Sequence, residues 1–110
     1  MMIPYNYQIP KASRVIITRH AQKRFTERFK LYFSNLRISS SYMWDDVIAA
    51  QVSSGSVCYR WMDCPFWVNK VWGNHGKVFV IKKNPCYYIV RERYDKKLVV
   101  ITVVDKWYND

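Results

Sequence analysis

Residues 77–104, which read KVFVIKKNPCYYIVRERYDKKLVVITVV, contain three apolar runs separated by short polar breaks. Runs of this length, rich in Val, Ile and Tyr, are typical of β-strands. The expected strands are 77–82, 87–93 and 98–104. Because the breaks are too short for a crossover, the three strands should pair as an antiparallel meander. The last run is apolar on both faces except at Thr102, which is typical of a central strand.

Two helices are expected before these strands. Thr18 can cap a helix over residues 19–33, and Ser41 can open a second helix that runs to about Val52. Gly55 follows, where a helix-ending residue with positive φ is wanted. The predicted buried faces are Ala21, Phe25, Phe29 and Tyr32 in the first helix, and Trp44, Val47, Ile48 and Val52 in the second.

The rest of the chain completes an α+β architecture. Residues 1–13 contain two prolines and predict an extended N-terminal arm. Residues 14–110 then form a single α+β domain, in which two N-terminal helices pack on a mostly antiparallel twisted sheet. Further short strands are expected at 14–17, 56–61 and 66–72, with a turn at Gly73-Asn74-His75-Gly76.

Composition limits the class of partner. The chain has 110 residues with 18 Lys and Arg against 8 Asp and Glu, a net charge of +10, and half of its residues are hydrophobic. This length suits one domain, and the apolar content excludes a wholly disordered chain. The positive charge favours nucleic acid, an anionic membrane or an acidic protein, and it excludes a DNA mimic.

The charge is unevenly distributed along the chain. Its net value is +7 over residues 1–38, −2 over 39–69 and +5 over 70–110. If the two ends meet in the fold, they make one basic face.

Cysteine usage and the termini indicate a cytoplasmic protein without cofactors. There is no apolar run of membrane-spanning length, and the first residues lack the basic start and apolar block of a signal peptide. The odd number of cysteines favours reduced thiols. The possible zinc ligands Cys58, Cys64, His75 and Cys86 match no established spacing, so no metal is expected.

A ridge on the first helix carries the strongest chemical signal. His20, Arg24 and Arg28 follow one another at four-residue spacing and border its apolar face. A histidine can exchange a proton near neutral pH, and guanidinium groups can grip a phosphate. Together they suit RNA transesterification, in which the 2′-hydroxyl is the nucleophile. In the structural alternative, His20 bonds a strand carbonyl, and the arginines pair with Glu27, Asp45 or Asp46.

A second basic group lies among aromatic residues near the C-terminus, where cations can follow a phosphate backbone and rings can stack on bases. The predicted nucleic-acid contacts are Lys23, Lys82, Lys83, Arg93, Lys96, Lys97, Tyr88 and Tyr108. The alternative is that alternation buries Tyr87 or Tyr88 and that Lys96 and Lys97 only keep a hairpin soluble. The aromatic group Trp61, Phe66, Trp67 and Trp72 suits a core or a partner surface better than base stacking.

The pattern H-A-x-x-R-x-x-E-R at residues 20–28, a helix with a Val-Ile pair and the strand 98–104 resemble the BrnT-like proteins of the RelE/ParE toxin superfamily. The resemblance covers roughly residues 16–55 and 77–108. It implies a RelE/ParE-like sheet flanked by helices and, for the RelE and BrnT branches, metal-independent RNA cleavage. It adds Arg91 to the candidate catalytic residues His20, Arg24 and Arg28. Two departures are the aromatic stretch 56–76 and a more aromatic C-terminal end, and ParE relatives poison gyrase without cutting.

Two functions follow as hypotheses. The first is an endoribonuclease-like toxin, with RNA as its target and an acidic antitoxin or a host protein as a further partner. The second is a non-catalytic inhibitor from a phage or mobile element that blocks a host enzyme or coats nucleic acid. Membrane attachment fits poorly, because neither expected helix is a long basic amphipath.

Overall fold

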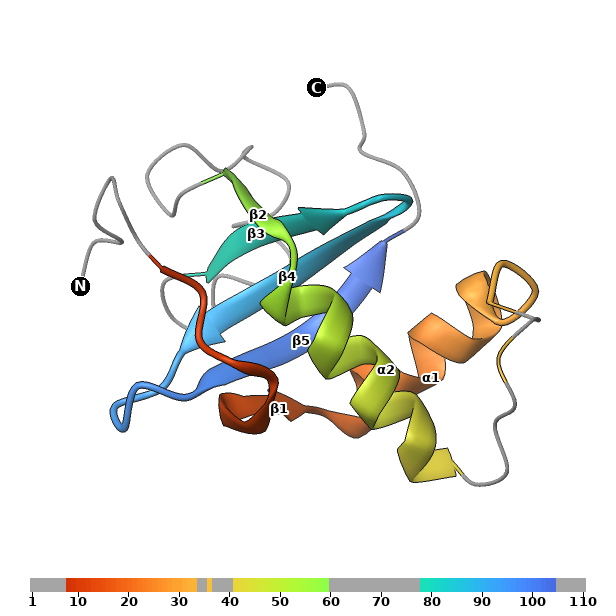
Figure 1. The fold of residues 1–110 in the computed structure, drawn as a ribbon, viewed down its shortest axis with the longest axis horizontal. Coiled ribbons are helices and arrows are strands. Elements are labelled where there is room, and N and C mark those ends of the chain that lie inside the picture. Colours follow the sequence, from red (N-terminus) through yellow and green to blue (C-terminus); the bar gives the residue numbers. More distant parts are fainter. Residues whose placement is uncertain (1–7, 34–35, 37–40, 60–77, 105–110) are drawn as a thin grey trace.

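Two helices pack on one face of a five-stranded sheet, as Figure 1 shows. The structure is a computed structural model, and it describes residues 8–33, 36, 41–59 and 78–104. The predicted α+β class is confirmed. The elements are η1 (Ala12–Arg14), β1 (Val15–Ile17), α1 (Arg19–Phe29), α2 (Ser41–Ser53), β2 (Ser56–Tyr59), β3 (Val78–Lys83), β4 (Cys86–Glu92) and β5 (Leu98–Val104).

The sheet is built around the predicted meander. Its strand order is β1-β5-β4-β3-β2, and β3, β4 and β5 pair antiparallel. β5 lies between β4 and β1 and is buried along its whole length, so the prediction of a central strand is confirmed. β1 pairs with it in parallel, from Val15 opposite Leu98 to Ile17 opposite Val100. The short N-terminal strand therefore brings the start of the chain against its end.

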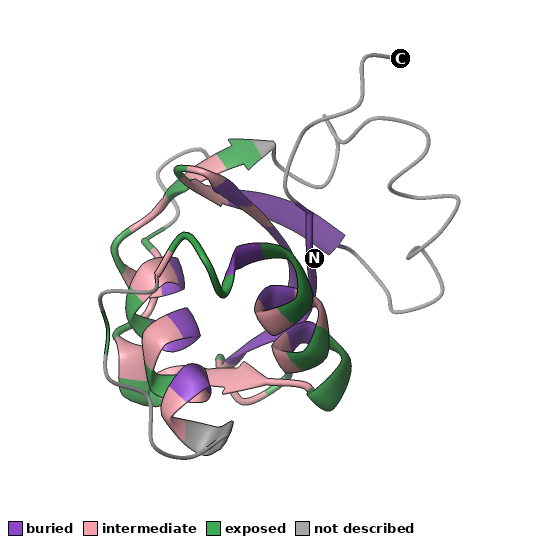
Figure 2. Cartoon of the chain, turned by 90° about the vertical axis from the view of Figure 1, so that its right-hand side faces the viewer, coloured by how far each residue is buried: buried purple, intermediate pink, exposed green. Residues whose placement is uncertain are grey.

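The main core lies between the helices and the sheet. α1 contributes Ala21, Phe25 and Phe29, all of them buried, and α2 contributes Trp44, Ile48 and Val52. The rings of Phe25 and Trp44 join the helices, with their centroids 5.7 Å apart. Figure 2 shows the buried surfaces of both helices turned toward the sheet.

The first helix is shorter than predicted, and its last apolar residue is different. α1 ends at Phe29, and Tyr32, which we predicted to be buried, is 63% exposed. Phe33 replaces it, since its ring stacks on Phe25 with centroids 5.3 Å apart. Phe33 continues the four-residue series of Ala21, Phe25 and Phe29, and its N–H donates to the Phe29 carbonyl oxygen at 3.2 Å.

The second helix starts at Ser41 as predicted, but Gly55 has a different role from the expected one. Its φ does not lie in the positive range. A Cβ added at this position would lie 2.8 Å from Ile81 Cγ2 and 2.8 Å from the Lys82 carbonyl oxygen. Glycine is therefore needed for the close approach of the α2–β2 link to β3.

The face of the sheet away from the helices is apolar as well. Alternation places Val80 on β3, Ile89 on β4 and Val104 on β5 on this face, and all three are buried. Within the described ranges, no helix lies over it. The structure describes the predicted strand 56–61 as β2 over Ser56–Tyr59, and residues 60 and 61, the predicted strand 66–72 and the turn 73–76 lie outside the described residues.

Neither described helix combines the length and apolar character needed to cross a membrane.

Candidate nucleic-acid interface

The turn between β4 and β5 is held by the side chain of Asp95. The Arg93 guanidinium donates two hydrogen bonds to this carboxylate, one of them from Nε to Oδ1 at 3.0 Å. The Lys97 backbone N–H donates a third at 3.2 Å. These bonds, with the guanidinium bond largest, hold the pKa of the Asp95 carboxyl well below its usual range. The carboxylate therefore stays ionised and fixes the turn at neutral pH.

Arg14 closes the same turn from the other end of the chain. Its guanidinium donates to the Asp95 carbonyl oxygen at 2.6 Å across 81 residues of sequence. Lys96 has a φ of 69°, in the left-handed region that non-glycine residues rarely adopt. Such a conformation persists where surrounding contacts hold it, and these often lie at functional sites. The turn is consequently a rigid structure.

This rigid turn presents an aromatic ring to solvent. Tyr94 is 93% exposed, and the Arg93 guanidinium carbon lies 5.8 Å from its ring centroid. Lys96 is exposed and Lys97 is half-buried beside it. We call Arg14, Arg93, Tyr94, Lys96 and Lys97 the turn patch. It combines a base-sized apolar surface with four cationic side chains.

The helix ridge forms as predicted, but its arginines have local partners. Arg24 pairs with Glu27 at 2.8 Å, which is the structural alternative raised by the sequence. Arg28 donates to the Val103 carbonyl oxygen of β5 at 2.6 Å. His20 is exposed in the first turn of α1. Each guanidinium has five N–H donors, so one bond leaves others available to a ligand.

The environment of His20 favours its neutral form. Partial burial lowers the pKa of the imidazole, and the positive charges of Arg24, Arg28 and Lys23 lower it further. A neutral imidazole near neutral pH can accept a proton. The ridge therefore has a base next to cations.

Arg91 does not join this ridge. It lies on β4 opposite Val78 and Val99, on the face of the sheet away from the helices. The sheet therefore separates it from His20, because alternate strand residues point to opposite faces. The predicted catalytic group of four residues is wrong in this respect.

Tyr88 is unavailable to nucleic acid. It is fully buried in the core beside Cys86, and burial raises the pKa of its phenol. The prediction that this ring stacks on bases is therefore wrong, and strand alternation buries Tyr88 as the alternative stated. Tyr87, its neighbour, is half-buried with Lys82 Nζ 5.3 Å from its ring centroid. Tyr108 lies outside the described residues.

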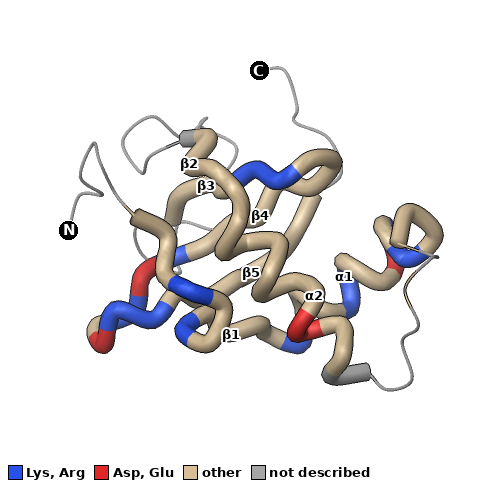
Figure 3. The backbone as a smooth tube through the Cα atoms, viewed as in Figure 1, with Lys and Arg blue, Asp and Glu red and all other residues tan. Residues whose placement is uncertain are grey.

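The predicted basic residues fall into separate groups. Lys82 and Lys83 end β3, whereas Arg93, Lys96 and Lys97 follow β4. Successive turns of a meander lie at opposite ends of a sheet, and Figure 3 shows these two basic regions apart. At about 3.3 Å per residue, the length of β4 separates them by roughly 20 Å. Lys23 is exposed on α1, in a third position.

The described cysteines show no metal chemistry. Cys86 is buried, and burial raises the pKa of its thiol to about 11, which disfavours the thiolate that a metal would bind. The described residues contain no group of three His, Cys, Asp or Glu side chains placed to hold a metal ion. Cys64 and His75 lie outside the described residues.

The chain was compared with known proteins. No protein-family model matches it, and no match is found among curated proteins or solved structures.

Sequence reasoning placed Tyr94 among the aromatic residues of the C-terminal basic group but did not name it as a contact, and it missed Arg14 as part of a site. Tyr94 lies in a polar break between strands, where alternation cannot bury a ring, and this signal was available from the sequence. Arg14 gave no such signal, since its partner is 81 residues away.

Proposed function

We propose that this protein binds single-stranded nucleic acid, RNA in particular, through the turn patch. The observation that carries the proposal is Tyr94, an almost fully exposed ring on a turn fixed by Asp95. Base stacking on an aromatic side chain contributes about 1–3 kcal/mol and is available to any base. A ring on a rigid turn loses little conformational freedom on binding.

The surrounding charge supports a polyanion as the ligand. Arg14, Arg93, Lys96 and Lys97 outnumber the carboxylates of this region (Figure 3), which are Glu92 at the end of β4 and Asp95, which already accepts from Arg93 and Lys97. Lys and Arg side chains near a phosphate backbone release its counterions, which drives binding without regard to sequence. A single strand is favoured over a duplex because its bases are free to stack.

Substitution of Tyr94 tests this proposal. Tyr94→Ala should weaken the affinity for a fluorescent single-stranded RNA by roughly 5- to 150-fold, the equivalent of about 1–3 kcal/mol. Tyr32→Ala is the matched control, because this tyrosine is also exposed but lies near the end of α1. Both variants should keep the wild-type unfolding midpoint. Equal affinities for both variants and the wild type would contradict the proposal.

Metal-independent RNA cleavage at the helix ridge is a second candidate. It is favoured by the lowered pKa of His20 beside Arg24 and Arg28. His20 would take the proton of a 2′-hydroxyl, whose oxygen would attack the adjacent phosphorus. The bond to the 5′-oxygen would break, leaving a 2′,3′-cyclic phosphate and a 5′-hydroxyl that takes its proton from water. The guanidinium groups would stabilise the added negative charge.

Incubation with RNA and excess chelator tests this candidate. The wild type should produce cyclic-phosphate ends, and His20→Ala should lose this activity while still binding RNA. Because the pKa of His20 is lowered, the cleavage rate should already be near its plateau at pH 7. Cleavage that His20→Ala leaves unchanged would rule the ridge out.

The relationship to RelE/ParE-like toxins belongs to the same proposal. It is supported by the H-A-x-x-R-x-x-E-R helix and by helices packed on a meander. The reduced thiols of Cys58 and Cys86 suit action in the cytoplasm. If no RNA binds and a host protein is retained stoichiometrically from nuclease-treated lysate, the non-catalytic inhibitor is favoured instead.

A further inference from the structure

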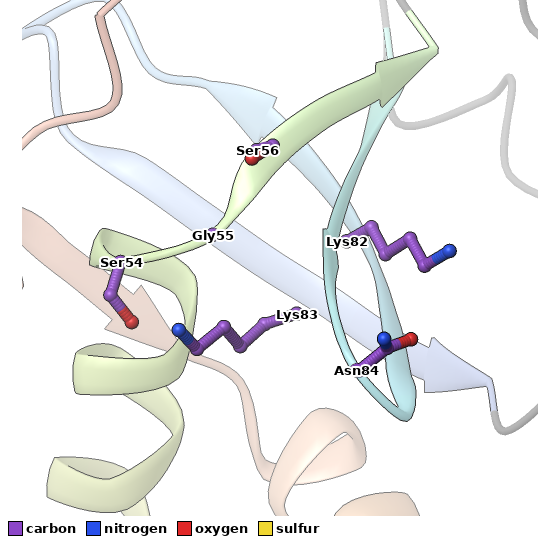
Figure 4. Close-up of a pocket in the computed structure, with 6 residues that line it drawn as sticks. All are labelled: Ser54, Gly55, Ser56, Lys82, Lys83 and Asn84. Carbon is purple, nitrogen blue, oxygen red and sulfur yellow. The ribbon is translucent and has the colours of Figure 1, made fainter.

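A polar pocket lies at the opposite end of the sheet from the turn patch. It has a volume of about 360 Å³ and lies where the end of α2, the start of β2 and the β3–β4 turn meet. This volume is near the lower limit for small-molecule sites, so it suits a ligand of nucleotide size. Figure 4 shows the lining residues, which are Ser54, Gly55, Ser56, Lys82, Lys83 and Asn84.

The walls of the pocket are fixed before any ligand arrives. Gly55 has no room for a side chain against Ile81 and the Lys82 carbonyl, so the α2–β2 link cannot shift inward. Ser56 pairs directly with Lys82 across the sheet. The exposed Ser54 hydroxyl donates to the Ala50 carbonyl oxygen at 2.8 Å at the end of α2. A preformed site loses less free energy on binding than a flexible one.

The charge of the pocket is positive and locally uncompensated. Of the described residues that line it, none is acidic, and neither lysine pairs with a described carboxylate. Lys83 extends toward Ser54, whereas Lys82 extends away from it (Figure 4). Lys82 Nζ lies 5.3 Å from the Tyr87 ring centroid, so the donors that can meet a ligand on the Ser54 side are the Lys83 ammonium, the Ser56 hydroxyl and the Asn84 amide (Figure 4).

Lys83 could instead have a purely structural role, as a cation that caps the C-terminal end of α2. A cation near the C-terminus of a helix offsets its dipole. However, three carbonyl oxygens near the end of α2 already have donors, since Ala50 and Gln51 accept from Ser54 and Val52 accepts from the Gly55 N–H. The Lys83 ammonium is therefore not required as a cap and can serve a ligand.

We propose that this pocket binds the terminal phosphate of a single-stranded nucleic acid, an inference that rests on the proposed function. A terminal phosphomonoester carries about −1.5 to −2 charges at pH 7 and three strong acceptor oxygens. These suit a site lined by the Lys83 ammonium, the Ser56 hydroxyl and the Asn84 amide, which come from two strands and a turn. An internal phosphodiester has only one charge and must continue at both ends.

Matched RNAs that differ only at their ends test the inference. The wild type should bind an RNA with a 5′- or a 3′-phosphate about tenfold more tightly than the same RNA with two hydroxyl ends. Lys83→Gln and Ser56→Ala should reduce this ratio to near one. Lys30→Gln, which removes an exposed lysine of α1, is the control and should keep the wild-type ratio. Tyr94→Ala should weaken all the RNAs and also keep the ratio.

The outcomes separate this inference from the proposed function. RNA binding with no preference for a phosphate end overturns the inference alone. If RNA does not bind at all, the proposed function fails, and NMR titration with inorganic phosphate and a mononucleotide then decides whether the pocket binds phosphate. Amide shifts confined to residues 54–56 and 82–84 support a phosphate pocket, and their absence overturns it. A mononucleotide that binds as tightly as phosphorylated RNA overturns the strand end as the ligand.

Discussion

Thr18 joins local and long-range structure through one hydroxyl group. Its Oγ accepts from the Ala21 N–H at 3.1 Å and so caps α1. The same hydroxyl lies 2.9 Å from the Val100 carbonyl oxygen and 3.1 Å from that of Ile101. Ile101 is the extra residue where the β4–β5 register shifts, since Val90 pairs with Val100 and Ile89 with Thr102. The cap therefore also supplies a donor to a bulge in the central strand.

Replacing Thr18 should therefore lower the free energy of unfolding by more than an ordinary surface substitution does. Thr18→Val keeps the shape but removes both functions of the hydroxyl, and it should lower the free energy of unfolding by about 1–2 kcal/mol. Thr26→Ala is the control, because its exposed hydroxyl donates only to the Lys23 carbonyl and its loss should change stability by less than about 0.5 kcal/mol. Urea titration followed by circular dichroism measures both. Equal costs would contradict the double role.

Asp95 makes the turn patch sensitive to acid. The hydrogen bonds from Arg93 and Lys97 lower the pKa of the Asp95 carboxyl. The ionised carboxylate therefore stabilises the turn fully at pH values above the ordinary carboxyl pKa near 3.9. This stabilisation is lost as the pH falls below that value and through the lowered pKa. NMR titration should show Asp95 still ionised at pH 3. Amide exchange at residues 93–97 should be unchanged between pH 7 and pH 5 after correction for intrinsic rates. A carboxyl that titrates near pH 4 would show that the turn is not held as described.

At the level of elements, short connections made the sheet predictable. The breaks at 84–85 and 93–97 allowed only antiparallel neighbours, and the continuous apolar run of β5 required neighbours on both sides. The end of α1 was not predictable in the same way. The i+4 series of Ala21, Phe25 and Phe29 continues to Phe33 through a turn, and the ring stacking on Phe25 selects it over Tyr32.

A glycine was correctly expected at position 55, but the structure requires it for a different reason from the one predicted. The sequence indicated a helix-ending glycine, but the structure needs it for space against β3. Gly55→Ala should lower the free energy of unfolding by about 1–3 kcal/mol, since the link must move away from Ile81 and Lys82. Ser54→Ala, at the neighbouring exposed position, should cost less than about 0.5 kcal/mol. A Gly55→Ala protein as stable as the wild type would show that the link is free to shift.

Across the whole molecule, the excess of positive charge is divided among sites. The ends of the chain do meet, as expected, because β1 pairs with β5 and Arg14 reaches Asp95. The single basic face does not form, since the meander sends the lysines of β3 and the turn patch to opposite ends. Charge counts along the sequence predicted that the partner is negatively charged. They could not predict that Arg91 lies on the face of the sheet away from the helices or that Tyr88 lies in the core, because both positions depend on the strand register.

Salt dependence follows from this distribution. If about three cations of the turn patch neutralise phosphates, the logarithm of the RNA affinity should fall with the logarithm of salt concentration with a slope of about −2. Fluorescence anisotropy between low and moderate salt measures this slope. Lys96→Gln should make the slope shallower by roughly 0.7, and Lys30→Gln, at the exposed end of α1, should leave it unchanged. A flat response would exclude a phosphate backbone as the ligand.

The most direct test of RNA binding at the turn patch is an NMR map of amide shifts during titration with a single-stranded RNA that has hydroxyl ends. The largest shifts should lie at Arg14 and at residues 93–97, with little change along the buried side of α2. RNA binding at the turn patch would be contradicted if the shifts spare residues 93–97. It would also be contradicted if no shifts occur at RNA concentrations that saturate basic proteins of this size.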